Sequence, residues 1–82
     1  MAEIEFNYNQ SITMIQANSD EPFQAVINRY IQKTFINPDS VCFFTNGSQV
    51  NKDKTVQNHM NELNKQNNKL KVLVYNINDD NE

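Results

Sequence analysis

Apolar and polar residues alternate along residues 3–15 in two runs separated by a polar stretch. In the first run, Ile4, Phe6 and Tyr8 share one parity, and acidic or amide residues take the other. In the second run, Ile12 and Met14 lie on one face. Because successive side chains of a strand point to opposite faces, this pattern predicts two strands joined by a short loop around residues 9–10.

Residues 20–35 have helical rather than strand spacing. Ser19 or Asp20 is expected to cap this helix by accepting backbone N–H bonds, and Pro22 is tolerated only in a first turn. Asp20 and Glu21 also suit the positive end of the helix dipole. The apolar positions form one stripe, which consists of Phe23, Val26, Ile27, Tyr30, Ile31 and Phe35. We therefore predict a helix that buries this stripe and ends before Pro38, which disfavours helical geometry at residue 37.

The second half of the chain predicts a hairpin, a short irregular or helical segment and a last strand. The run "VCFF" is a strand, "SQV" is a brief returning strand, and Asn46 and Gly47 between them are a strong hairpin signal, since both can adopt positive φ. Residues 53–63 are expected to be helical or irregular, with Thr55 as the candidate cap. In "KLKVLVYNI", one face carries Leu70, Val72 and Val74, and the other carries Lys71, Leu73 and Tyr75.

Adjacent phenylalanines in the "VCFF" strand raise a question of orientation. Their side chains point to opposite faces, so only one ring can enter a given core. If Val41 and Phe43 face the core, then Cys42 and Phe44 face outward. The same parity argument turns Leu73 outward when its neighbours of the opposite parity are buried.

Size and charge limit the functions that the chain can have. Eighty-two residues make a single domain, whose core is expected to span about residues 3–76, with 77–82 as an acidic tail. A net charge of −3 with scattered Lys and Arg argues against a nucleic-acid binder. The longest apolar runs are too short to cross a membrane. One cysteine and no visible secretory signal favour a reducing compartment, so we expect a cytoplasmic or nuclear protein.

The order strand, strand, helix, strand, short strand, short helix, strand resembles the ubiquitin family, and so do several segments. "SITMIQANSDEPF", "KTVQNHM" and "KLKVLVYNI" are similar to the corresponding ubiquitin segments. In "INPDSVCFFTNGSQV", five residues are identical to ubiquitin: Ile36, Pro38, Asp39, Gly47 and Gln49. The resemblance covers residues 4–76 and implies an α+β fold, the ubiquitin-like β-grasp, with a mixed four- to five-stranded sheet wrapped around one main helix.

The chain also departs from the ubiquitin pattern. Ubiquitin-type modifiers end in a diglycine, whereas this sequence has "NINDDNE" at that place, so conjugation is not expected of the chain as given. The first hairpin is about a residue shorter, and about three residues are inserted at "LNKQNNK". These differences point away from a modifier and towards an interaction domain.

The resemblance implies a recognition patch on the outer face of the sheet. Phe44 stands where ubiquitin has the central isoleucine, Leu73 where it has the valine, and Lys71 where it has the patch histidine. Tyr8 lies near the place of the patch leucine, and Tyr75 and Cys42 belong to the same face. The alternative is that Phe44 tucks under the tail or the inserted loop. Exposed apolar clusters with aromatic anchors are typical of partner sites.

The residues do not suggest catalysis or a cofactor. Cys42 needs a base or a positive neighbourhood to act as a nucleophile, and none is evident. His59 is expected to make structural hydrogen bonds, and two metal-capable side chains without a spacing motif do not predict a zinc site. Asp20 and Glu21 suit helix capping better than paired acid–base chemistry, so we expect no enzyme.

Three hypotheses about function follow. The first is a non-enzymatic, monomeric ubiquitin-like domain that binds a protein partner, such as a component of the ubiquitin–proteasome pathway, through the face around Phe44 and Leu73. The second is a modifier whose diglycine lies outside this sequence. The third is a scaffold or assembly β-grasp domain, which would need a basic strand facing an acidic loop.

Overall fold

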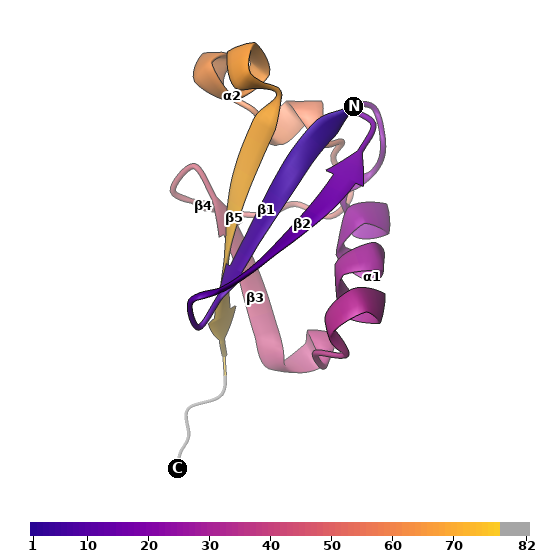
Figure 1. Ribbon diagram of the computed structural model, residues 1–82, viewed down its shortest axis with the longest axis vertical. Helices are drawn as coiled ribbons and strands as arrows, with labels where there is room; N and C mark the ends of the chain where they lie inside the picture. Colours follow the sequence, from indigo (N-terminus) through magenta and orange to yellow (C-terminus); the bar gives the residue numbers. More distant parts are fainter. Residues whose placement is uncertain (78–82) are drawn as a thin grey trace.

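A mixed five-stranded sheet with a helix packed across one face is the framework of the molecule (Figure 1). The computed structural model describes residues 1–77. Its elements are β1 (Ala2–Tyr8), β2 (Ser11–Ala17), α1 (Phe23–Thr34), β3 (Val41–Thr45), β4 (Ser48–Gln49), α2 (Glu62–Asn67) and β5 (Lys69–Asn76), with 3-10 turns η1 (Pro38–Ser40) and η2 (Gln57–His59). The strand order is β2-β1-β5-β3-β4, with β1 and β5 parallel and the other pairs antiparallel. The predicted α+β architecture is confirmed, whereas the predicted acidic tail lies outside the described residues, apart from Ile77.

Both hairpins turn through two residues with positive φ. Asn46 and Gly47 have φ of 51° and 81°, as the Asn-Gly signal predicted, and Thr45 pairs with Ser48. Asn9 and Gln10 have φ of 50° and 70°, although neither is glycine. Two positive φ angles give the type I′ turn, whose twist matches that of the flanking strands. The β1–β2 register therefore follows from a tight two-residue turn.

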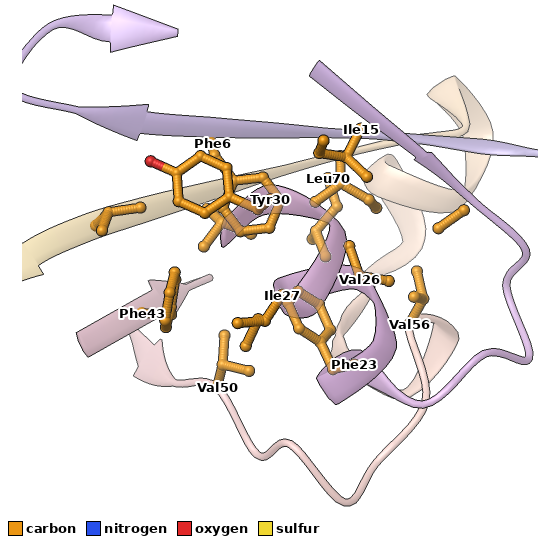
Figure 2. Close-up of a cluster of buried hydrophobic side chains, with 14 of the residues drawn as sticks. Phe6, Ile15, Phe23, Val26, Ile27, Tyr30, Phe43, Val50, Val56 and Leu70 are labelled. Carbon is orange, nitrogen blue, oxygen red and sulfur yellow. The ribbon is translucent and has the colours of Figure 1, made fainter. Parts of the chain in front are cut away.

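Three stacked or edge-on aromatic rings join α1 to the sheet (Figure 2). Phe6 of β1 stacks on Tyr30 of α1 with centroids 4.2 Å apart, and Phe43 of β3 meets both rings edge-on at 6.0 and 6.1 Å. Each aromatic pair contributes about 0.5–1.5 kcal/mol beyond the burial of its area. Burial, with a smaller effect of the nearby Tyr8, raises the pKa of the Tyr30 phenol. Phe43 is thus committed to the core, as its parity predicted.

Apolar side chains from every long element surround these rings (Figure 2). The further core residues are Ala2, Ile4, Ile15, Ala17, Phe23, Val26, Ile27, Val41, Val50, Val56, Leu70, Val72 and Val74. The helical stripe is buried as predicted from Phe23 to Tyr30, and Ile31 packs partly against it. At roughly 1.5–3 kcal/mol for each large side chain removed from water, this core is the main source of stability.

The predicted stripe is wrong at its last position, Phe35. The helix ends at Thr34, and Phe35 adopts left-handed backbone angles, φ 62° and ψ 23°, while its N–H donates to the Ile31 carbonyl at 2.7 Å. This change of direction leaves its ring 88% exposed. Helices commonly end in such a residue, but the position is usually glycine because a Cβ is strained there. The spacing rule failed because it assumed one more helical turn.

The predicted caps of α1 are also wrong. The helix begins at Phe23, after Pro22, and no side chain caps it. Instead, the N–H groups of Phe23 and Gln24 donate to the carbonyls of Lys54 and Lys52 at 2.8 and 3.2 Å. A loop more than 25 residues away in the chain therefore satisfies the free N–H groups of the first turn.

Glu21 forms an ion pair in place of the predicted cap. Its carboxylate accepts the Asn18 N–H at 2.8 Å and pairs with both terminal nitrogens of the Arg29 guanidinium at 2.8 and 3.0 Å. Arg29 also donates to the Gln16 carbonyl at 2.9 Å. The Glu21–Arg29 pair therefore links β2, the entry loop and α1.

The segment predicted as irregular or helical contains two short elements. The first is η2. Thr55 lies one residue before its N-cap, Val56, and the Thr55 hydroxyl accepts the Asn58 N–H at 3.4 Å. The inserted residues form α2, whose first turn is closed by reciprocal hydrogen bonds between Asn61 and Asn64, both 2.9 Å. Asn68 ends α2 with φ 55°. Across residues 1–77, neither α1 nor α2 has the length and apolar character of a membrane span.

Glu21 is expected to make stability depend on pH. Hydrogen bonds from Arg29 and Asn18 hold the pKa of the Glu21 carboxyl below its ordinary value of 4.5. Its contribution is therefore present above about pH 4.5 and is lost as the pH falls through the lower folded pKa. We expect Glu21→Gln to unfold more easily at neutral pH than the parent and to lose less stability on acidification. Urea denaturation at several pH values measures both; parallel curves for parent and variant would contradict the assignment.

Phe35→Gly is expected to stabilise the domain by about 0.5 kcal/mol. Glycine removes the strain of a left-handed residue, about 1–2 kcal/mol, and this gain is partly offset by the greater entropy of the unfolded chain. Little packing is lost because the ring is exposed. Thermal or urea denaturation tests this, with Phe35→Ala as a control that retains the strain and should not stabilise. A clear loss of stability in the glycine variant would show that the ring packs against the fold.

Candidate protein-binding surface

The sheet face opposite α1 carries an apolar cluster on two neighbouring strands. In the antiparallel β3–β5 pair, Phe44 lies opposite Leu73, and Cys42 lies opposite Tyr75. The rings of Phe44 and Tyr75 meet edge-on with centroids 5.8 Å apart. Leu73 and Tyr75 are 37% and 51% exposed, and Phe44 is half-buried. We call Phe44, Leu73 and Tyr75 the docking patch.

A shallow hollow of about 510 Å³ opens over the docking patch. It is lined by Phe44, Thr45, Asn46, Gly47, Lys71, Leu73 and Tyr75. The apolar side chains come from two paired strands, and the β3–β4 turn contributes one wall. Sheet pairing thus holds the hollow in place, which favours binding without prior rearrangement.

Thr45 aligns the two strands that carry the docking patch. It is the one polar residue among those described as buried, and its hydroxyl donates to the Lys71 carbonyl at 2.7 Å. This bond extends the β3–β5 pairing past Phe44 to the rim of the hollow. Sequence reasoning missed Thr45 and interpreted Asn46 and Gly47 only as a turn. The signal that places these residues at the patch is that residues 45–47 directly follow Phe44.

Lys71 borders the patch but is not an isolated positive charge. Its ammonium lies 3.9 Å from one carboxylate oxygen of Glu5, and the ammonium of Lys69 lies 3.6 Å from the other. Glu5 reaches this position because parallel pairing of β1 with β5 sets it beside Lys71. The Lys71 side chain is 66% exposed, so the pair is screened and weak. An approaching carboxylate could therefore compete for the ammonium.

Tyr8 does not join the patch, contrary to the prediction. It pairs with the buried Val74 and packs against the core on the α1 side of the sheet, and its hydroxyl donates to the Asn76 side-chain carbonyl at 2.9 Å. Its parity with Ile4 and Phe6 already placed it on that face. The prediction relied on an approximate alignment with ubiquitin. In this chain β1 ends at Tyr8 and the two-residue turn follows directly.

Cys42 shares the patch face but not the hollow. It is half-buried opposite Tyr75, and it lines a smaller depression that includes Val50 and Ile77. Lys52 also lines this depression. Of the six residues predicted for the site, the structure brings together Phe44, Lys71, Leu73 and Tyr75, places Cys42 beside them and separates Tyr8.

His59 makes the structural hydrogen bonds that were expected of it. Its Nε2 accepts the Asn51 N–H at 3.1 Å, so Nδ1 is the nitrogen that donates to the Thr55 carbonyl, at 2.8 Å. The ring also lies edge-on to Phe23, 4.6 Å between centroids. Both nitrogens are engaged in holding the 51–59 loop. In the described part of the chain, no three His, Cys, Asp or Glu side chains gather as a metal site would require.

Comparisons with known proteins identify the fold. No protein-family model matches the chain, and no curated protein matches it by sequence. Among solved structures, it is similar to a crystal structure of ATBAG1 in complex with HSP70, with a TM-score of 0.74 over 93% of this chain. The chain has a ubiquitin-like β-grasp fold. This β-grasp chain is 10% identical to the matched chain and spans 40% of it, so the likeness concerns the fold alone.

The two adjacent phenylalanines are expected to respond differently to truncation. Phe43→Ala empties part of the aromatic core and should cost about 3–5 kcal/mol of stability. Phe44→Ala removes a half-buried ring from the outer face and should cost about 1 kcal/mol. Urea denaturation of both variants measures the contrast. A loss at Phe44 as large as that at Phe43 would mean that the outer ring belongs to the core.

Proposed function

We propose that this β-grasp chain is a protein-interaction domain that binds its partner through the docking patch. The observation that carries the proposal is the hollow over Phe44, Leu73 and Tyr75, in which apolar side chains face solvent on two paired strands. Exposed apolar surface of this kind is costly to maintain and commonly marks a partner site. The ATBAG1 structure similar in fold is itself a complex with another protein, HSP70, which agrees with a binding role.

The hollow suits an apolar side chain presented by a helix. Burying one such side chain contributes roughly 1.5–3 kcal/mol, and an aromatic ring at the centre of a contact is a typical binding hot spot. The Lys71 ammonium at the rim is exposed and only weakly held by Glu5, so an acidic residue beside the apolar anchor would complement it. The partner we propose is therefore an amphipathic helix with acidic flanks, such as the receptors of the ubiquitin–proteasome pathway present.

Binding is proposed in preference to catalysis because the groups able to do chemistry are engaged elsewhere. Both ring nitrogens of His59 form hydrogen bonds with the backbone of its own loop. Cys42 lies outside the hollow, opposite Tyr75 and in a smaller depression that Lys52 also lines. A patch of this size fits a transient complex, so we expect a Kd between about 10 µM and 1 mM.

Amide NMR titration of the labelled domain with a panel of ubiquitin-binding helices tests the proposal. We expect shifts centred on Phe44, Lys71 and Leu73, and Phe44→Ala should weaken binding by roughly tenfold or more. Ile12→Ala is the matched control, because Ile12 is 59% exposed and lies on the same face in β2, three strands away from Phe44 in the sheet. It should bind as the parent does. Shifts confined to α1 or to β2, or equal weakening by both variants, would overturn the proposed site.

A further inference from the structure

The β3–β4 turn holds the single asparagine of the chain that glycine follows, Asn46. An Asn-Gly pair can react with itself, because no Cβ on the second residue hinders the approach of its backbone nitrogen. The Gly47 nitrogen attacks Asn46 Cγ, a C–N bond forms, the Cγ–Nδ2 bond breaks, and ammonia leaves with the displaced proton. Water then opens the cyclic imide at either carbonyl, which yields aspartate or isoaspartate. Water is the only co-reactant.

In the folded protein, the Asn46 side chain is held away from this reaction. Its Nδ2 donates to the His59 carbonyl and to Asn64 Oδ1, both at 2.8 Å, and its Oδ1 accepts from Asn61 Nδ2 at 3.3 Å. Asn61 and Asn64 are the residues whose reciprocal hydrogen bonds begin α2. We call Asn46, Asn61 and Asn64 the amide junction. Cγ cannot turn towards its own backbone until these bonds open.

We propose that Asn46 is a deamidation site whose reaction is gated by the docking of α2 at the amide junction. The reactive pair lies in an exposed turn of the sheet. Two of its three restraining bonds come from the N-cap and first turn of a six-residue helix that contributes no buried residue. Such a peripheral element opens far more often than the core does. The rate of deamidation therefore reports how often the junction opens.

The product would prevent the junction from closing again. A carboxylate at position 46 has no N–H to donate, so the His59 carbonyl and Asn64 Oδ1 would face a negative charge instead of a donor. Isoaspartate would in addition lengthen the backbone of the turn. Because Asn46 and Gly47 also line the hollow over the docking patch, deamidation would alter one of its walls. This last consequence rests on the proposed function, whereas the chemistry and its gate do not.

Deamidation kinetics test the gate without any partner. Trypsin releases residues 34–52 as one peptide, which contains the reactive pair but neither Asn61 nor Asn64. We expect isoaspartate at position 46, located by fragment-ion mass spectrometry, to form at least about tenfold faster in that peptide than in the folded protein at neutral pH. Equal rates in peptide and folded protein, or no product at Asn46 in the peptide, would overturn the proposal.

Two substitutions at Asn64 separate the gate from general loss of fold. Asn64→Ala removes an acceptor of the Asn46 amide and should speed deamidation in the folded protein by roughly fivefold to tenfold. Asn64→Asp retains the acceptor oxygens and should not. Circular dichroism melts establish that both variants remain folded under the conditions of the assay. An alanine variant that deamidates no faster than the aspartate variant would overturn the role of α2.

The product is mimicked by Asn46→Asp, with Asn28→Asp as the charge-matched control. Asn28 lies in α1 and uses only its side-chain oxygen, which accepts from Gln24 at 2.9 Å, so aspartate preserves its contact. We expect amide hydrogen exchange in α2 to be about tenfold faster for Asn46→Asp and unchanged for Asn28→Asp. Unchanged exchange in both variants would overturn the coupling between position 46 and α2. Binding of a helix to the docking patch is a separate measurement, which tests the proposed function and not this coupling.

Discussion

The contact between Phe6, Tyr30 and Phe43 is the interaction on which the rest of the structure depends. These rings come from β1, α1 and β3, so one cluster holds the helix against both the N-terminal hairpin and the later hairpin (Figure 2). A chain of this length buries only about 60–65% of its unfolded surface, so few other contacts can replace it. Because Phe43 points inward, strand geometry turns Phe44 outward.

Sheet pairing places the outward-facing Phe44 beside other apolar side chains on the same face. The β3–β5 register sets Phe44 opposite Leu73, and the Thr45 hydroxyl fixes the strands just beyond them by bonding to the Lys71 carbonyl. The inserted segment is bound to the same region through the amide junction, which ties α2 to the tip of the β3–β4 hairpin. The docking patch therefore lies on two paired strands, and α2 reaches the turn beside it through the hydrogen bonds of the amide junction.

Much of this arrangement could be predicted from local patterns, and the errors have two causes. Alternation and the Asn-Gly signal placed the strands and the second hairpin, because period and turn chemistry act over a few residues. The predictions for Asp20 as a cap, Phe35 as core and Tyr8 as part of the patch were wrong. The first two relied on local pattern at the ends of α1, which depend on a distant loop and on a backbone reversal at Phe35. The third followed the alignment with ubiquitin, whereas the alternation of β1 places Tyr8 on the core face.

By itself, the sequence determined which residues form strands and helix and which face of each is apolar, since these properties follow from covalent spacing. It also set Phe44 and Leu73 on the solvent side. Only the tertiary structure decided that they lie opposite each other, that the loop at residues 52–54 caps α1, and that Glu5 reaches Lys71. Those contacts join residues far apart in the chain, and their geometry exists only after the core has aligned the strands.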